Sequence, residues 1–482
     1  MLIISTKNKD GLLAARERAA NEPVFVEDND NAIIRRLEEL AKHYDDAAYE
    51  GRRVECYVVF DDSTSLWLLQ TVGLPKEIEQ KIDVFASTKE DLIAKAVFLK
   101  LPTLTSIFPP LDRTPLSYDS EAIVHLVIIG FSAQAEALAI NAALVSHYPN
   151  YCRDTRLRTR ITIIDDDVYL GKDHLTQRYV HLFDNSYYRT IDLSDVEPHC
   201  VLHRPLYEQT RKDFVDIEWE FVNGNVRNGA VRQKLTEWSS DSRQYLTVSI
   251  CHDNQNRNYN EAFSLPLDVY KNNIPVLCYT DESDIIRMAN AESAYSSICP
   301  FGKSLCDIGI LRILKKLAQR VNYVYNHCFS LASGDPITSP SMIDEGKLET
   351  QWRNVGSLPK QYSNIFNAMT LATKMHSIGH SSDDWREYYA LTLDEINMLT
   401  EVEHNRWNVE ELILGYRPTT DEEQQQIEND ISQKKVFRNK KIHYDLRAFD
   451  DLRSDSTGKN VNVYDMALTQ GIPLIIKSCI TD

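Results

Sequence analysis

The stretch from His125 to Asp167 decides the fold. It reads HLVIIGFSAQAEALAINAAL over 125–144 and, after a basic interruption, RITIIDDD over 160–167. HLVIIG is a continuous apolar run, which is typical of a parallel strand with both faces covered by helices. Gly130 then opens a turn, and small residues follow at helical spacing. The order strand, glycine turn, helix, strand predicts a unit of a parallel α/β sheet.

The glycine turn and the acidic strand end supply candidate cofactor residues. In the dinucleotide fingerprint G-x-G-x-x-G, glycines allow a tight turn, close approach of the backbone to pyrophosphate, and close helix packing. Here these positions are Gly130, Ser132 and Ala135, and Asp165 and Asp166 stand where a carboxylate normally accepts ribose hydroxyls. We therefore predict a Rossmann-like doubly wound sheet that binds NAD or another nucleotide through these five residues, with no metal. The alternative is an ordinary solvated strand end.

The length of 482 residues requires several domains, because one hydrophobic core does not grow to that size. Strand and helix patterns alternate from the start of the chain without a glycine-rich turn, and a proline-rich stretch over 101–122 interrupts them. The expected fold class is α/β, with a partial Rossmann-like domain first and a mainly helical domain last. The predicted units are a partial Rossmann-like domain at 1–104, the sheet domain at 122–285, a connecting helical segment at 286–332, and the helical domain at 350–482.

Composition and charge exclude several classes of partner. The net charge of −18 argues against binding to bulk nucleic acid, since phosphate contacts need Lys and Arg. The opening MLIIST lacks the apolar region of a signal peptide, and no run approaches 18 apolar residues, so we expect no membrane insertion. Nine cysteines without a CxxC pair indicate free thiols in a reducing compartment. We expect a cytoplasmic protein.

A second candidate site lies in the expected helix that contains EHNRW at Glu403–Trp407. Its side chains offer hydrogen-bond donors, acceptors and an aromatic face, which suit a planar base and a phosphate. The predicted ligand-binding set is His404, Asn405, Arg406, Trp407, Tyr416, Arg417 and His443. The alternative is a buried His–Asn–Arg network that anchors the helix, with Trp407 in the core.

Two parts of the chain resemble known families. Residues 122–285, through VIIGFSAQAEAL and TIIDDD, resemble the TrkA-N family, the NAD-binding regulatory (RCK) domains of potassium transport systems. Residues 350–475, through EHNRWNVEELILGYRP, IHYDLRAFDDL and KNVNVYD, resemble the ryanodine receptor repeat, or RyR domain. Bacterial proteins that join these two domains have been linked to nucleotide sensing in defence and to potassium transport. The resemblance implies ligand recognition and regulation, without catalytic apparatus.

No G-x-S-x-G, P-loop or H-E-x-x-H motif occurs in the chain. We therefore expect a non-enzymatic, nucleotide-responsive sensor that acts through domain rearrangement or assembly in a defence or potassium-transport system. Its expected partners are a small nucleotide, further copies of itself, and a membrane or effector protein. Two alternatives stay open. One is an enzyme that processes NAD or a nucleotide with Glu403, His404 or the aspartate cluster, and the other is an interaction scaffold without a ligand.

Overall fold

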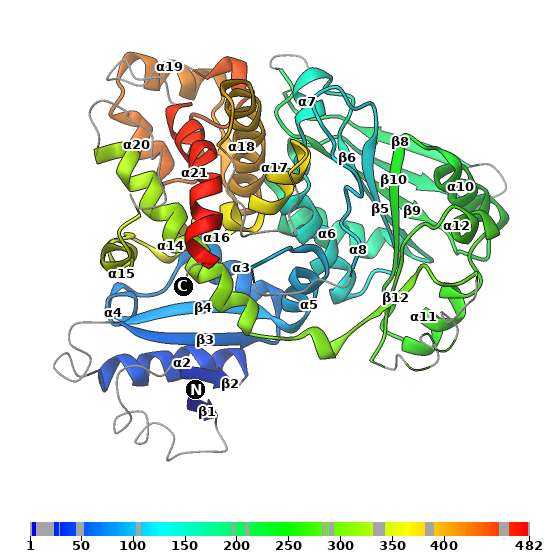
Figure 1. Ribbon diagram of the computed structural model, residues 1–482, viewed down its shortest axis with the longest axis horizontal. Coiled ribbons are helices and arrows are strands. Elements are labelled where there is room, and N and C mark those ends of the chain that lie inside the picture. Colours follow the sequence, from blue (N-terminus) through cyan, green and yellow to red (C-terminus); the bar gives the residue numbers. More distant parts are fainter. Residues whose placement is uncertain are drawn as a thin grey trace.

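The computed structural model is an α/β protein with two largely parallel sheets and a layer of helices beside them (Figure 1). The predicted class is confirmed at this level. The structure describes residues 2–5, 24–27, 29–44, 53–102, 108–194, 198–207, 212–281, 284, 286, 288, 294–330, 343–380, 390–452 and 462–480.

The large sheet has the strand order β12-β11-β10-β5-β6-β9-β7-β8, and every neighbouring pair is parallel except β7 and β8. Its strands are β5 (Ile123–Ile129), β6 (Thr159–Asp165), β7 (Tyr188–Asp192), β8 (His199–His203), β9 (Ile217–Asn223), β10 (Gln244–Ile250), β11 (Val276–Tyr279) and β12 (Ile298–Phe301). The range 286–332, predicted as a connecting helical segment, therefore contains a strand of this sheet, β12, as well as helix α14. A four-residue run such as ICPF has too little periodicity to be recognised as a strand.

Helices cover both faces of the large sheet, as the apolar run in β5 predicts. Leu126 and Ile128 join the buried cluster that contains α6, whereas Val127 and Ile129 join the cluster that contains α10. This alternation follows from the two-residue period of a strand. The helices are α6 (Ala133–Val145), α7 (Pro149–Arg153), α8 (Val168–Arg178), α9 (Val180–Asp184), α10 (Gly229–Ser240), α11 (Gln255–Ala262) and α12 (Leu267–Lys271).

The strand order of the large sheet reverses between β5 and β10. From β5 the chain proceeds to β6, then to β7 and β8 at the margin of the sheet, and back to β9 beside β6. It then crosses to β10 on the other side of β5 and continues to β11 and β12. At such a reversal the connections after the two central strands leave in opposite directions, which opens a crevice at their carboxyl ends.

The N-terminal sheet contains β1 (Leu2–Ser5), β2 (Val24–Glu27), β3 (Val54–Phe60) and β4 (Ile82–Thr88), all parallel and in chain order. Among its described strands there is therefore no reversal of strand order. Its helices are α2 (Asp30–Lys42), α3 (Ser63–Val72), α4 (Lys76–Glu79) and α5 (Lys89–Phe98). α5 packs against α6 of the large sheet, and Asn141 of α6 donates to Asp91 of α5 over 3.0 Å. The two sheets are thus joined through a helix pair.

The rest of the chain is mainly helical and packs against both sheets (Figure 1). The long helix α14 contacts α5 of the N-terminal part as well as α15, α16 and α21. The elements of this helical part are α14 (Gly309–Ser330), α15 (Glu345–Arg353), α16 (Leu358–Met369), α17 (Leu371–Ser377), α18 (Leu393–Ile413), β13 (Arg417–Pro418), α19 (Asp421–Asn429), α20 (Gln433–Arg438), β14 (Ile442–His443) and α21 (Val463–Ile480), with a short 3-10 turn at Lys303–Leu305 and another at Phe449–Asp451.

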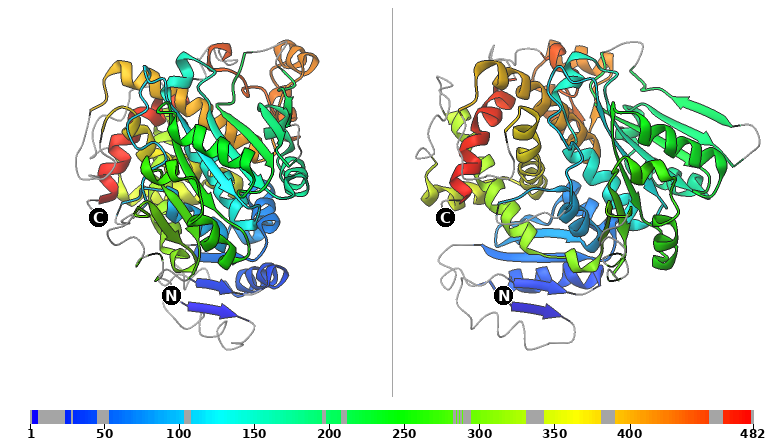
Figure 2. Two further views of the ribbon diagram at one scale, coloured as in Figure 1. Left: turned by 90° about the vertical axis from the view of Figure 1, so that its right-hand side faces the viewer. Right: turned by 45° about the vertical axis from the view of Figure 1, so that its right-hand side comes forward.

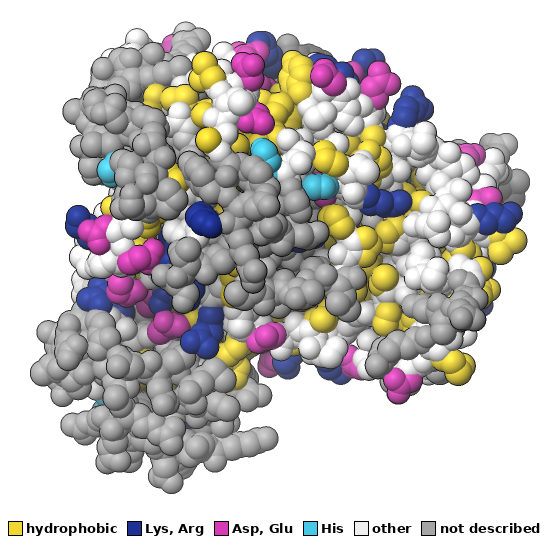
Figure 3. All heavy atoms as spheres, in the orientation of Figure 1, with side chains coloured by type: hydrophobic (Ala, Val, Ile, Leu, Met, Phe, Trp, Pro, Cys, Tyr) yellow, Lys and Arg dark blue, Asp and Glu magenta, His cyan; other side chains and the backbone are white. Residues whose placement is uncertain are grey.

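The surface carries both signs of charge. On the face shown in Figure 3, Lys and Arg side chains lie among Asp and Glu side chains over the described residues. Among the described helices, none combines the length and the apolar character that crossing a membrane requires.

Candidate functional site

Gly130 forms the turn at the carboxyl end of β5 and holds it against the end of β10. Its φ of +96° lies in a region that side-chain-bearing residues rarely adopt. A Cβ at this position would lie 2.6 Å from Nδ1 and 2.8 Å from the backbone N of His252. A glycine is therefore required at this position for two reasons: the positive φ, and the lack of space for a Cβ between the two strand ends.

The other two positions of the predicted fingerprint begin α6. Ser132 is the N-cap, and its Oγ accepts a hydrogen bond of 3.3 Å from the backbone N of Ala135. Ala135 is completely buried against the sheet. A hydroxyl that accepts this bond still has a proton to donate, so capping leaves Ser132 able to contact a ligand.

Asp165 ties the end of β6 to the glycine turn. Its Oδ2 accepts a hydrogen bond of 3.0 Å from the N–H of Phe131, and its Oδ1 accepts one of 3.1 Å from the N–H of Asp167. Each carboxylate oxygen keeps a second lone pair for a ligand hydroxyl. The structure thus brings the predicted glycine, serine and aspartate positions to one edge of the sheet.

Asp166 belongs to a chain of polar contacts that crosses this edge, which we call the edge network. It comprises His252, Glu261, Arg257, Asp166 and Asn225. His252 Nε2 lies 2.7 Å from Glu261 Oε2, and Arg257 Nε lies 2.7 Å from Glu261 Oε1. Arg257 Nη2 then lies 2.8 Å from Asp166 Oδ2, and Asn225 Nδ2 donates to Asp166 Oδ1 over 2.6 Å.

The edge network places a buried charge beside a partly exposed ion pair. Burial raises the pKa of Glu261, but hydrogen bonds from His252 and Arg257 outweigh that effect and hold the pKa below its ordinary value. Glu261 is therefore an anion, while Arg257 and Asp166 reach solvent. Sequence reasoning missed His252, Arg257 and Glu261, although the four-residue spacing of the last two on one helix is a signal for a pair.

The EHNRW residues of α18 form a buried ionic network. Arg406 Nη2 lies 2.8 Å from Glu403 Oε1, Arg406 Nη1 bonds Glu410, and Lys374 bonds Glu403. All four side chains are buried. Burial raises the pKa of Glu403, but Arg406 and Lys374 outweigh it and lower the pKa to about 2. Arg406 is thus buried in a network within the protein, as in the alternative to a ligand site, but its partners are Glu403 and Glu410 in place of His404 and Asn405, and Trp407 is only partly buried.

His404 and Asn405 also contact protein groups. His404 lies 3.2 Å from Asp465 Oδ2 through Nδ1 and 2.9 Å from the carbonyl of Arg447 through Nε2. Asn405 Nδ2 lies 3.7 Å from Sγ of Cys152, which belongs to α7. α18 also contacts α6 and α9. His404 therefore binds within the helical part, whereas Asn405 and the other contacts of α18 join that part to the helices of the large sheet.

Four of the predicted ligand residues meet in an aromatic cluster, in which the ring of His404 lies 5.6 Å from that of Trp407. The ring of His443 lies 4.9 Å from that of Trp407 and 6.0 Å from that of Tyr416. Burial lowers the pKa of His443 to about 3, so its ring is neutral at pH 7. Arg417 is not part of the cluster, because its guanidinium pairs with Glu423 at 2.7 Å. Both arginines that we expected to hold a phosphate are thus paired with carboxylates.

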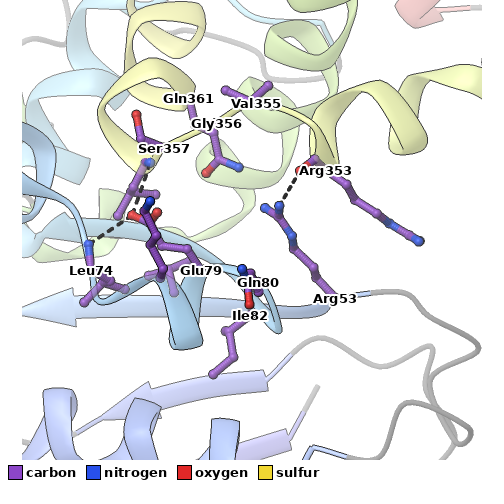
Figure 4. Close-up of a pocket in the computed structure, with 13 residues that line it drawn as sticks. Arg53, Leu74, Glu79, Gln80, Ile82, Arg353, Val355, Gly356, Ser357 and Gln361 are labelled. Atoms are coloured by element: carbon purple, nitrogen blue, oxygen red, sulfur yellow. Dashed lines mark hydrogen bonds between the residues drawn. The ribbon is translucent and has the colours of Figure 1, made fainter.

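A cavity of about 260 Å³ lies between the N-terminal sheet and the turn that joins α15 to α16 (Figure 4). Glu79 Oε1 accepts hydrogen bonds from the N–H groups of Leu74, at 3.0 Å, and Leu358, at 3.3 Å. Arg53 donates to the carbonyl of Arg353 on the other side. The N-terminus of α16 favours an anion, and the carboxylate of Glu79 occupies that position.

Within the described ranges, no group of three His, Cys, Asp or Glu side chains is placed to hold a metal ion. Comparison of the chain with models of protein families, with curated proteins and with solved structures finds no match. The candidate site therefore rests on its own geometry.

Proposed function

We propose that the protein is a non-enzymatic, nucleotide-responsive regulator that binds a nucleotide or dinucleotide at the carboxyl edge of the large sheet, between β5 and β10. One observation carries this proposal: the strand order reverses at a glycine turn that leads directly into a helix. When β7 and β8 are set aside, which follow β6 in the chain and form one margin of the sheet, the remaining strands β5, β6, β9, β10, β11 and β12, numbered from 1 to 6, have the order 3-2-1-4-5-6 when read from β9 to β12. This is the order of the Rossmann dinucleotide-binding sheet, whose ligands bind at the reversal.

The residues at this edge suit both halves of a nucleotide. The carboxylates of Asp165 and Asp166 can accept hydrogen bonds from ribose hydroxyls, and the N-terminus of α6 beside Ser132 favours a phosphate. Arg257, which pairs with Asp166 at 2.8 Å, supplies a cation for the same phosphate. A bound nucleotide would thus separate this ion pair. Asp166 would bind the ribose in place of Arg257, and Arg257 would bind the phosphate in place of Asp166.

The response to the ligand passes through α6. This helix begins at the glycine turn, and both α6 and the following α7 contact α18 of the helical part. A ligand shifts the arrangement of these parts only if it binds one arrangement more tightly than the other. The resemblance to TrkA-N and RyR domains supports a role of this class in a potassium-transport or defence system.

Thermal unfolding with NAD, NADH, ATP, ADP-ribose and cyclic oligonucleotides tests the proposal. A ligand at about 100 times its Kd stabilises the native state by about 2.7 kcal/mol. We expect at least one nucleotide to raise the Tm, and Asp166→Asn to reduce that rise. Asp119→Asn is the matched control, because Asp119 is exposed and precedes β5 at the opposite edge of the sheet.

Two results would overturn the proposal. A Tm that no nucleotide changes would favour a scaffold without a ligand. Chromatography of the incubated nucleotide provides the second check, since its conversion to a product would make the protein an enzyme.

A further inference from the structure

We propose that β8 is an interaction surface through which two copies of this chain pair, edge to edge, into one continuous sheet. In the described part of the chain, β8 is the outermost strand of the large sheet, and it pairs antiparallel with β7. The right-hand view of Figure 2 shows these strands at the outer margin of the molecule. This inference is independent of the nucleotide site.

The side chains of β8 are exposed on both faces of the sheet. Val201 is 53% exposed and Leu202, which points to the opposite face, is 45% exposed. Leu206, just beyond the strand, is 78% exposed, and its N–H donates a hydrogen bond of 2.9 Å to the carbonyl of Asp184. The edge therefore presents apolar side chains beside a row of backbone hydrogen-bonding groups.

The sequence of β8 does not protect this edge. Natural edge strands avoid pairing through charged side chains, prolines or bulges. β8 reads His-Cys-Val-Leu-His, which contains neither Asp, Glu, Lys, Arg nor Pro. Pro198 and Pro205 lie just outside the strand and limit pairing to about these five residues. A second strand can therefore add to it without burying a charge.

A second copy fits this edge because the strand is nearly symmetric about its centre. Pairing around a two-fold axis is antiparallel and places the same surface on both partners. With the axis at Val201, this residue faces its own copy, Cys200 faces Leu202 of the partner subunit, and His199 faces His203 of the partner subunit. All five residues then have a partner, whereas any other centre shortens the ladder. No like charges meet, which matters for two chains of net charge −18.

The molecular mass in solution is the first test. Sedimentation equilibrium of the full chain at micromolar concentration should give about 111 kDa, twice the 55.4 kDa of one chain. Val201→Lys brings two ammonium groups together at the axis, so this variant should give the mass of one chain. The position is exposed, and an unchanged Tm and circular dichroism spectrum would show that the variant folds.

Cross-linking tests the register. Opposite residues of an antiparallel pair alternate between Cα separations of about 4.5 and 5.5 Å, and a disulfide spans about 4.4 to 6.8 Å. Leu202→Cys should therefore form a disulfide with Cys200 of the partner subunit under mild oxidation. Val201→Cys in a Cys200→Ser background should join its own copy at the axis. Either product migrates as a covalent dimer on a non-reducing gel.

The matched control is Leu393→Cys in the Cys200→Ser background. Leu393 is 68% exposed but starts α18, so this variant should stay monomeric on the gel. A wild-type chain that sediments as a monomer would overturn the proposal. So would a dimer that Val201→Lys leaves intact, or the absence of cross-linking from both cysteine variants.

Discussion

Arg406 and Glu403 form an ion pair within α18, with 2.8 Å between Arg406 Nη2 and Glu403 Oε1, and both side chains are buried. The same guanidinium bonds Glu410 one turn further along the helix. A phosphate at Arg406 would have to displace two carboxylates from a site without solvent. The pair therefore belongs to the structure of the helix and not to a ligand pocket.

Replacement of Arg406 by Leu should destabilise the protein by about 3–5 kcal/mol, because it leaves the buried Glu410 without a cation and Glu403 with Lys374 alone. Urea unfolding followed by circular dichroism measures the change. The matched control is Arg417→Leu, which breaks a more exposed pair with Glu423 and should cost less than about 1 kcal/mol. Equal effects of the two substitutions would contradict the structural role of Arg406.

Replacement of Gly130 by Ala should destabilise the protein by at least about 2 kcal/mol. The new Cβ would meet the backbone at the end of β10 and would force a side chain into positive φ. Gly229→Ala is the control, since a Cβ there meets no atom within 4 Å and the site begins a helix. We expect this control to be neutral or slightly stabilising in the same unfolding experiment. If both variants unfold alike, the close contact with His252 is not a constraint.

Glu411 should make the stability depend on pH. Burial raises the pKa of Glu411 from 4.5 to about 8, and the neighbouring Glu410 adds to the rise. The folded state then holds a proton that the unfolded state releases, so this contribution to stability is complete below about pH 4.5 and is lost as the pH rises towards 8.

Wild-type protein should therefore lose stability between pH 5 and 8 by more than the Glu411→Gln variant does, since glutamine has no proton to release. Urea midpoints at the two pH values give the comparison. Glu422→Gln, at an exposed position of α19, is the control and should keep the wild-type slope. A Glu411→Gln variant with the same slope as wild type would show that Glu411 stays charged in the folded state.

Local features of the fold could be predicted because their signals are local. The apolar run of β5, the glycine at its end and the small residues of α6 lie within about one βαβ unit and specify strand, turn and helix directly. The capping box of α18, formed by Thr392 and Glu395, is a local signal of the same kind, because the two residues are three positions apart. The edge network was missed because its members come from segments far apart in the chain, and their contact depends on the order of the strands.

The sequence alone determined that a parallel sheet runs through the middle of the chain and that Gly130, Ser132 and Asp165 share its carboxyl edge. Hydrophobic period and chain direction are sufficient for that conclusion. Only the tertiary structure decided the roles of the polar residues. Arg406 and Asp166 are equally capable of binding a ligand as isolated side chains, but one is enclosed by carboxylates and the other reaches solvent. The burial of a side chain depends on all the residues that pack around it, many of them distant in the sequence, so a local sequence pattern does not predict it.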